Sequence, residues 1–114
     1  MTISAVLPVV PVSDFDAAER WYTTFFDRAA DRHPMDGLSE WQLGDYAVVQ
    51  VFHSPDKAGR TALNFVDDDL DRHLADLADR GIDATEPITV AKGRQRLATI
   101  SDPDGNQLSL IEDI

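Results

Sequence analysis

The chain has 114 residues, a length typical of one domain that buries a core of its own. Its 21 acidic and 10 basic residues give a net charge of −11, which argues against nucleic acid as a partner. The absence of cysteine excludes disulfides and thiolate metal sites. No stretch is long and apolar enough to span a bilayer, and residues 1–5 lack the basic start of a signal peptide, so we expect a cytoplasmic location.

The first half of the chain predicts a strand, a helix and three further strands. The apolar, β-branched run 6–12 predicts the first strand, after which Ser13 or Asp14 caps a helix that ends at Asp27. Apolar side chains with helical spacing predict one buried face on this helix. They are Phe15, Ala18, Tyr22 and Phe25 or Phe26. The three strands are expected near 29–35, 38–43 and 46–53, and a polar, turn-rich link at 54–60 follows them.

The second half repeats this order. Residues 61–66 predict a strand, and the aspartates 67–69 open a helix in which they serve as capping and dipole charges. Leu70, Leu74 and Leu77 form its apolar stripe, and Gly81 suits the position just past its end. Three strands are expected after the helix, at about 84–90, 95–101 and 107–112.

The fold class follows from this repeat. We expect an α+β domain over residues 1–114, in which two tandem βαβββ modules form curved antiparallel sheets around a concave cleft, with the helices on the outer face. The first module spans about 5–53, the linker about 54–60 and the second module about 61–113. Residues 49–52 and 108–111 occupy matching places, each with one polar residue inside an apolar strand.

The segment from Ile100 to Glu112 predicts a hairpin. Pro103 presets a turn φ, Gly105 accepts a positive φ, and Asp102 and Asn106 can bond back to the turn backbone. Its sequence strongly resembles the closing hairpin of the vicinal oxygen chelate superfamily, also called the glyoxalase/bleomycin-resistance/dioxygenase superfamily. Trp21–Asp27 resembles the end of the family's first helix, and Gly93 before the seventh strand also matches. At 26 and 27 the family's usual Leu-Gly is replaced by Phe-Asp.

This resemblance implies where metal ligands would stand. Metal-using members present His, Glu or Gln from four strands, at fixed offsets from these landmarks. Here the offsets lead to Leu7, to Thr61 or Ala62, to Val49 or Gln50, and to Ser109. None of these is His, Asp or Glu, and Gln50 alone could coordinate a metal, weakly. Because a divalent metal normally needs three or four protein ligands, we expect no metal and no cofactor. The three histidines are expected at surface or edge positions, with His73 facing solvent and only His53 near the rim of the cleft.

Strand alternation indicates which side chains line the cleft. If Gly44-Asp45 is a two-residue turn, then Trp41 lies opposite Val48, and Ser39 opposite Gln50. Flat walls and polar handles of this kind suit a planar or heteroaromatic ligand. The predicted ligand-binding residues are Trp41, Tyr46, Gln50, Phe52, Arg96 and Ser109. The alternative is that Trp41 and Phe52 pack against the helix, because a register error of one residue inverts both faces.

Three functions are compatible with this sequence. The resemblance to the bleomycin-resistance branch implies a metal-free, drug-sequestering protein that binds a small organic ligand, cationic or aromatic, at the boundary of a homodimer. The negative charge supports a cationic ligand, although a solvated acidic surface explains it as simply. The first alternative is a metal-dependent lyase or oxidoreductase of the glyoxalase or dioxygenase type. The second is a metal-free enzyme using the same cleft; no nucleophilic triad or phosphate loop is visible, and Glu40 or Glu112 as a general base has no specific support.

Overall fold

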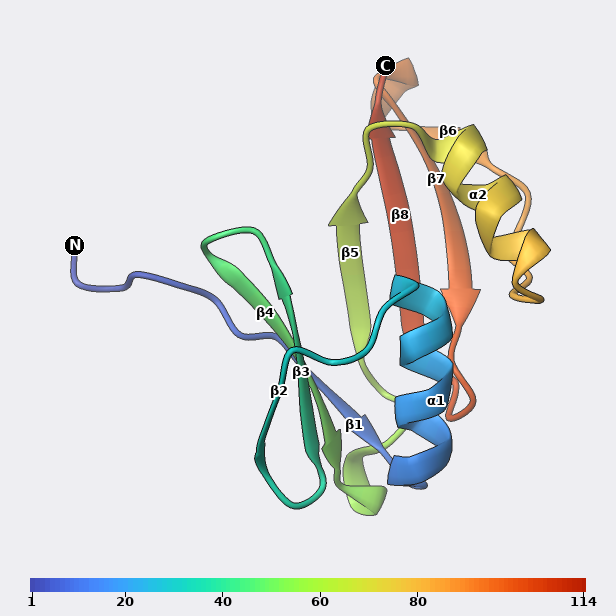
Figure 1. The fold of residues 1–114 in the computed structure, drawn as a ribbon. Coiled ribbons are helices and arrows are strands. Elements are labelled where there is room, and N and C mark those ends of the chain that lie inside the picture. The colour runs from blue at the N-terminus through green and yellow to red at the C-terminus, as the bar shows by residue number, and fades with distance from the viewer.

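The computed structural model describes residues 1–114 and contains two copies of one βαβββ unit (Figure 1). The first module comprises β1 (Val9–Val12), α1 (Phe15–Phe26), β2 (Arg32–Met35), β3 (Leu38–Leu43) and β4 (Ala47–His53). The second comprises β5 (Ala62–Val66), α2 (Leu70–Asp79), β6 (Ile88–Val90), β7 (Gln95–Ser101) and β8 (Gln107–Asp113). Short 3-10 turns cover Pro55–Lys57 and Ala91–Gly93. The predicted element order is confirmed, although β1, β2 and β6 are shorter than expected.

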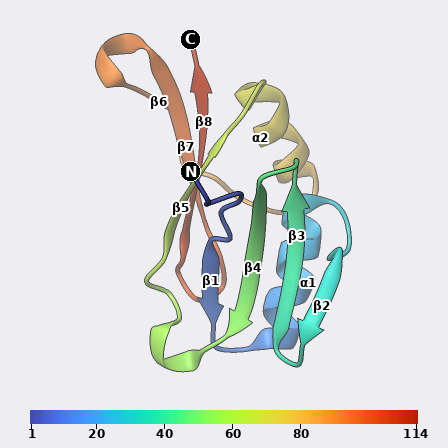
Figure 2. The ribbon, with the colours of Figure 1, turned by 90° about the vertical axis from the view of Figure 1, so that its left-hand side faces the viewer.

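Each module forms a four-stranded sheet, in the order β1-β4-β3-β2 and β5-β8-β7-β6. The strands of the first sheet lie side by side in Figure 2, with α1 behind them. Three strands of each sheet are antiparallel, whereas β1 joins β4 and β5 joins β8 in parallel. Parallel neighbours need a long connection between them, which here is the helix and two strands of the same module. The sheets are therefore mixed rather than purely antiparallel.

Both helices begin and end where the sequence predicts. The side chain of Asp14 accepts a hydrogen bond from the Ala17 amide at 3.1 Å, and Asp69 accepts one from the Arg72 amide at 3.2 Å. These N-caps satisfy amides that would otherwise lack a partner within the helix. Asp27 ends α1 with a φ of 57°.

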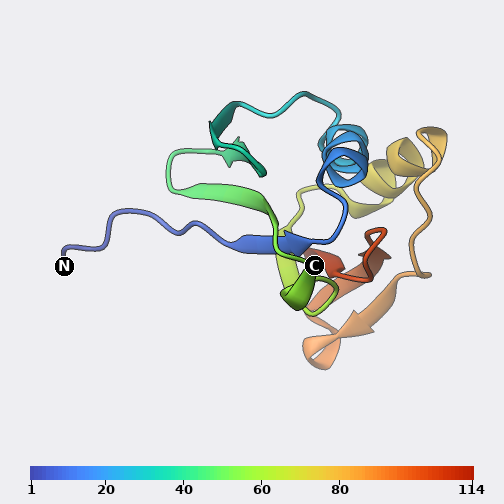
Figure 3. The same ribbon diagram turned by 90° about the horizontal axis from the view of Figure 1, so that it is seen from below.

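Both helices and both sheets contribute to a single hydrophobic core of 15 buried residues. Figure 3 shows α1 and α2 on the same side of the two sheets. The helices thus cover one face of each sheet and leave the other face, called here the open face, without a helix. The open face of the first sheet carries Val9, Pro11, Met35, Leu38, Glu40, Gln50 and Phe52. The open face of the second sheet carries Ala62, Asn64, Val66, Ile88, Leu97, Thr99, Gln107, Ser109 and Ile111.

The hairpin turn at 102–106 ties the modules together. The buried Asp102 carboxylate accepts hydrogen bonds from the Tyr22 hydroxyl of α1 at 2.8 Å and from the Asn106 amide at 2.9 Å. Asn106 Nδ2 donates to the Pro11 carbonyl at 2.9 Å, and Asn106 Oδ1 accepts from the Thr61 amide at 3.0 Å. Burial and the nearby Asp102 carboxylate raise the pKa of Tyr22, so its hydroxyl stays a donor. The 102–106 turn therefore links β1, α1 and the start of β5.

The linker also packs against the 102–106 turn. A Cβ added at Gly59 would clash with the Asp104 carbonyl oxygen, and Gly59 has a φ of 83°. Ser13, between β1 and α1, bonds to the Asp104 carboxylate from the other side. Glycine is thus required where the linker crosses the turn. Neither helix is long and apolar enough to cross a membrane.

Candidate functional site

The β3–β4 connection decides which side chains face the helices. Leu43 pairs with Ala47, so the connection has three residues, Gly44 to Tyr46, and not two. Trp41 consequently lies opposite Val49, and Gln50 opposite Glu40. The pairing expected from a two-residue turn is wrong by one residue, and this shift separates Trp41 from Gln50 because neighbouring positions point to opposite faces.

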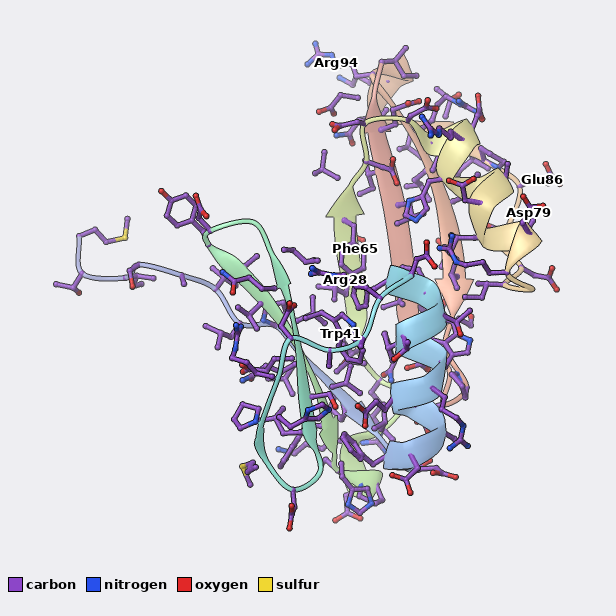
Figure 4. All side chains as sticks on the ribbon, in the orientation of Figure 1. Arg28, Trp41, Phe65, Asp79, Glu86 and Arg94 are labelled. Carbon is purple, nitrogen blue, oxygen red and sulfur yellow. The ribbon has the colours of Figure 1, made fainter.

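Trp41 belongs to the core. Its side chain has no exposed surface, and its ring lies 5.4 Å from that of Phe26 and 6.1 Å from that of Tyr22. Its indole N–H donates to the Arg28 carbonyl at 3.0 Å. Figure 4 shows Trp41 between the first sheet and α1. The alternative in which this residue packs against the helix is therefore the one observed, and the prediction that it lines the cleft is wrong.

Gln50 and Phe52 lie together on the open face of the first sheet. They line a cavity of about 520 Å³, within the range of small-molecule sites. Most of its wall is apolar, and Lys57 supplies the charged side chain at its edge. The other lining residues are Val9, Pro11, Met35, Leu38 and Ser54. Tyr46, by contrast, lies in the β3–β4 connection with 73% of its surface exposed, and it does not line this cavity.

Glu40 lies on the open face of the first sheet, opposite Gln50, and was not among the predicted ligand-binding residues. The residue is 7% exposed, and its carboxylate accepts hydrogen bonds from Gln50 Nε2 at 2.6 Å and from Arg32 Nε at 3.0 Å. The bond from Gln50, helped by Arg32, holds the pKa of Glu40 below its ordinary value, so the carboxylate is charged at neutral pH. A negative charge thus stands directly beside the polar residue of the cavity.

The open face of the second sheet carries the matching polar position. Ser109 lies opposite Thr99, and their hydroxyls are 2.9 Å apart. The next row across the sheet is apolar, and two of its members are well exposed, Val66 at 78% and Ile88 at 55%. This row consists of Val66, Ile111, Leu97 and Ile88. Ser109 therefore corresponds to Gln50, and Ile111 to Phe52, as expected from residues 49–52 and 108–111.

Arg96 lies on the helix-covered side of the second sheet. Its guanidinium pairs with Asp71 of α2 at 3.1 Å and with Glu112 at 3.7 Å. It alternates with Leu97, which is on the open face. The sequence argument placed Arg96 on the same face as Ser109, and the observed register, in which Ser109 faces Thr99, corrects that placement.

The structure thus brings together two of the six predicted site residues, Gln50 and Phe52. Ser109 occupies the open face of the other module, and no cavity of the chain is lined by both open faces. The expected cleft between the sheets is therefore not enclosed by one chain. The positions to which the resemblance led, Leu7, Thr61 or Ala62, Val49 or Gln50, and Ser109, supply no imidazole or carboxylate. No three His, Asp or Glu side chains are grouped so as to hold a metal ion.

The histidines are partly different from expectation. His33 of β2 pairs with Glu19 of α1 at 2.6 Å, and His53 is exposed at the end of β4. His73 does not simply face solvent. Its Nδ1 bonds to the Asp67 carboxylate, and its ring lies 6.4 Å from that of Phe25 in α1. The apolar spacing within α2 does not reveal that His73 contacts a residue of α1.

Comparisons with solved structures show where this fold recurs. A glyoxalase/bleomycin resistance protein from Catenulispora acidiphila DSM 44928 is 29% identical, with a TM-score of 0.88 over 96% of this chain and 98% of that one. TnmS3, an antibiotic-binding protein from Streptomyces sp. CB03234, is 28% identical, with a TM-score of 0.81 over 100% and 99%. A bleomycin-binding protein complexed with bleomycin has the same fold at 23% identity, with a TM-score of 0.78 over 96% and 98%.

No match was found among curated proteins. The family model described as Glyoxalase/Bleomycin resistance protein/Dioxygenase superfamily matches residues 3–110, which is nearly the whole chain. The match includes both modules and the 102–106 turn. This chain therefore belongs to the glyoxalase/bleomycin resistance protein/dioxygenase superfamily.

Proposed function

We propose that this chain is a metal-free binding protein that sequesters a small organic molecule, flat, aromatic and cationic. The observation that carries the proposal is the cavity on the open face of the first sheet, where Phe52 provides an aromatic wall and Gln50 a polar group. An apolar wall with few polar groups is the usual composition of a small-molecule site. The likeness to TnmS3, an antibiotic-binding protein at 28% identity, supports the binding of a small organic molecule.

The charge of the ligand is inferred from the surroundings of the cavity. Glu40 places a carboxylate behind Gln50, and the chain as a whole carries a charge of −11. A field of this sign raises the local concentration of cations at low ionic strength. Arg32 offsets part of the Glu40 charge, and Lys57 stands at the edge of the cavity. The ammonium or guanidinium group of the ligand is therefore expected beside Gln50 and Glu40, away from Lys57, with its rings against Phe52.

A second copy of the chain is expected to complete the site. The open face of the second sheet exposes the apolar row that contains Val66 and Ile88, and apolar rows of this kind are typical of surfaces that become covered. In a homodimer, the open face of one chain's first sheet would meet the open face of the partner's second sheet. Ser109 would then lie across the cleft from Gln50, as the resemblance to the bleomycin-resistance branch implies.

The absence of metal chemistry is part of the proposal. The donor set at Leu7, Gln50, Ala62 and Ser109 offers one amide oxygen and one hydroxyl as side-chain donors, whereas stable sites for divalent transition metals use several imidazoles, carboxylates or thiolates. This donor set supports recognition without a metal.

The direct test is a calorimetric titration with bleomycin-type glycopeptides and other planar antibiotics, with and without divalent ions. We expect saturable binding that is unchanged by chelator. Phe52→Ala and Gln50→Ala should weaken binding at least tenfold. Thr89→Ala, at an exposed position on the opposite side of the second sheet, is the control and should bind like the unchanged chain. Absence of heat and of thermal stabilisation across this panel would refute the proposed ligand class.

Two further measurements separate the parts of the proposal. Elemental analysis of chelator-free protein is expected to find no bound metal, and about one metal ion per chain would instead favour the enzymatic alternative. Sedimentation equilibrium should give twice the mass of the 12.6 kDa chain. Ile111→Lys should shift that mass towards the monomer and abolish binding together with it.

A further inference from the structure

A second cavity lies on the side of the sheets that the helices cover. It has a volume of about 460 Å³ and is bounded by the end of α1, by α2 and by β5. Three phenylalanines line it, Phe25 and Phe26 from α1 and Phe65 from β5. The Phe65 ring lies 5.9 Å from that of Phe25 and 6.1 Å from that of Phe26. This cavity shares no residue with the one that contains Gln50 and Phe52.

The basic groups around this cavity are already paired. Arg80 of α2 donates from Nε to the Thr24 carbonyl at 2.8 Å and from Nη2 to the Phe25 carbonyl at 3.1 Å, and so caps the end of α1. His73 bonds through Nδ1 to the Asp67 carboxylate, which also accepts the Asp69 amide at 3.0 Å. The contacts of Arg80 are with neutral carbonyls and leave its positive charge in place, whereas His73 is bonded to a carboxylate.

The acidic groups at the mouth of the cavity are free. Asp27, at the end of α1, and Asp76, on α2, are exposed and take part in no ion pair. The cavity lining contains three carboxylates, of Asp27, Asp67 and Asp76, against the single guanidinium of Arg80 and an imidazole bonded to Asp67, so the balance of charge around it is negative. The partly exposed rings of Phe26 and Phe65 line the same cavity, and aromatic rings attract cations. An aromatic surface with free carboxylates at its edge matches an organic cation and disfavours an anion of the same shape.

We infer that this cavity is a second ligand site, distinct from the proposed cleft, and that it binds an organic ammonium ion with an aromatic or apolar body. The body contacts Phe25, Phe26 and Phe65, and the ammonium group lies between Asp27 and Asp76. The inference does not depend on the proposed function, because the two cavities lie on opposite faces of the sheets.

The test uses three probes of similar shape on the full chain: 2-phenylethylamine, benzyl alcohol and phenylacetate. Amide chemical shifts should move on addition of the amine at Asp27, Val66 and His73, and affinity should fall in the order amine, alcohol, carboxylate. No saturable shift with the amine, or equal binding of phenylacetate, would overturn the inference. Shifts confined to the strands that carry Gln50 and Phe52 would also overturn it, because they would assign the amine to the other cavity.

Matched variants on α2 make the charge argument specific. Asp76→Asn should weaken the amine about fivefold, as expected for losing one unit charge roughly 4 Å away in water. Asp79→Asn removes the same charge from the same helix, but Asp79 lies on the outer side of α2, away from β5 (Figure 4), and should leave the affinity unchanged. Because both positions are exposed, neither variant should alter the thermal unfolding midpoint by more than a degree or two. Equal weakening by both would mean that only the overall charge matters, which contradicts a site.

Discussion

The two faces of the first sheet are made by alternate residues of the same strands, yet they differ in what they do. On β4, Val49 and Val51 are buried against the helices, whereas Gln50 and Phe52 line a cavity on the open face. β8 has the same division, with Leu108 and Leu110 in the core. The residues of the covered face therefore contribute to the stability of the core, whereas those of the open face can be substituted with little effect on it.

The open faces of the two modules differ in turn. The first carries the Glu40 carboxylate with its two hydrogen-bond donors, Gln50 and Arg32. The second carries the apolar row that includes Ile111. The two modules have the same strand order and the same alternation of covered and open positions, yet their open faces carry different side chains.

The largest expected change in stability comes from replacing a large aromatic residue by alanine, and it should differ between the two faces. Trp41→Ala should lower the free energy of unfolding by about 3–5 kcal/mol, because it leaves a cavity in the core. Phe52→Ala should lower it by less than about 1 kcal/mol while weakening ligand binding, since surface substitutions cost little. Urea denaturation of both variants checks this. Equal losses of stability would show that the two faces are not separated in function.

A smaller loss is expected from the 102–106 turn, which holds the two covered faces in one core. Asn106→Ala removes the bonds to Pro11 and Asp102 and leaves the Thr61 amide unpaired, at a cost of about 2–3 kcal/mol. Gln107→Ala, at the exposed neighbouring position, is the control. Both modules should unfold in one calorimetric transition in the unchanged chain. Two separate transitions would contradict the coupling described here.

The Glu40 carboxylate on the first open face should affect how stability depends on pH. The pKa of Glu40 lies below its ordinary value of 4.5, so the contribution of this carboxylate to stability is complete above about pH 4.5. It is lost as the pH falls through the lower, folded-state pKa. Glu40→Gln should remove this part of the acid dependence. Unfolding midpoints between pH 3 and pH 7 measure it, and parallel curves for both proteins would exclude the effect.

The smallest effect is expected at Arg96. Its ion pair with Asp71 is solvent-exposed, and such pairs contribute about 0–1 kcal/mol. Arg96→Gln should therefore change stability little and should leave ligand affinity unchanged, because the side chain lies on the helix-covered side. A tenfold loss of affinity would restore Arg96 to the site and would put the register of the second sheet in doubt.

The sequence predicted those features that depend on local chemistry. Asp14 and Asp69 cap their helices, and Pro103 and Gly105 mark the turn, because each of these preferences acts over a few residues. The faces of the strands were harder to predict. A connection of three residues instead of two moved Trp41 from the expected cleft into the core.

Contacts between distant elements had no signal in the sequence. The bond between Gln50 and Glu40 depends on the strand register, and the contact of His73 with Phe25 depends on how α2 packs against α1. Gln50 and Phe52 could be selected because alternation within one strand does not depend on the partner strand. The same reasoning could not assign the face of β3, whose position relative to β4 is set by the turn.

The 102–106 turn has a consequence for how the chain is made. Asp102 and Asn106 reach back 80 residues to Tyr22 and 95 residues to Pro11. During translation, Tyr22 and Pro11 are therefore synthesised 80 and 95 residues before the side chains that bond to them. Until residues 102–106 emerge, β1 and α1 lack these hydrogen bonds. A truncation that removes residues 102–106 would therefore act on β1 and α1, at the opposite end of the sequence.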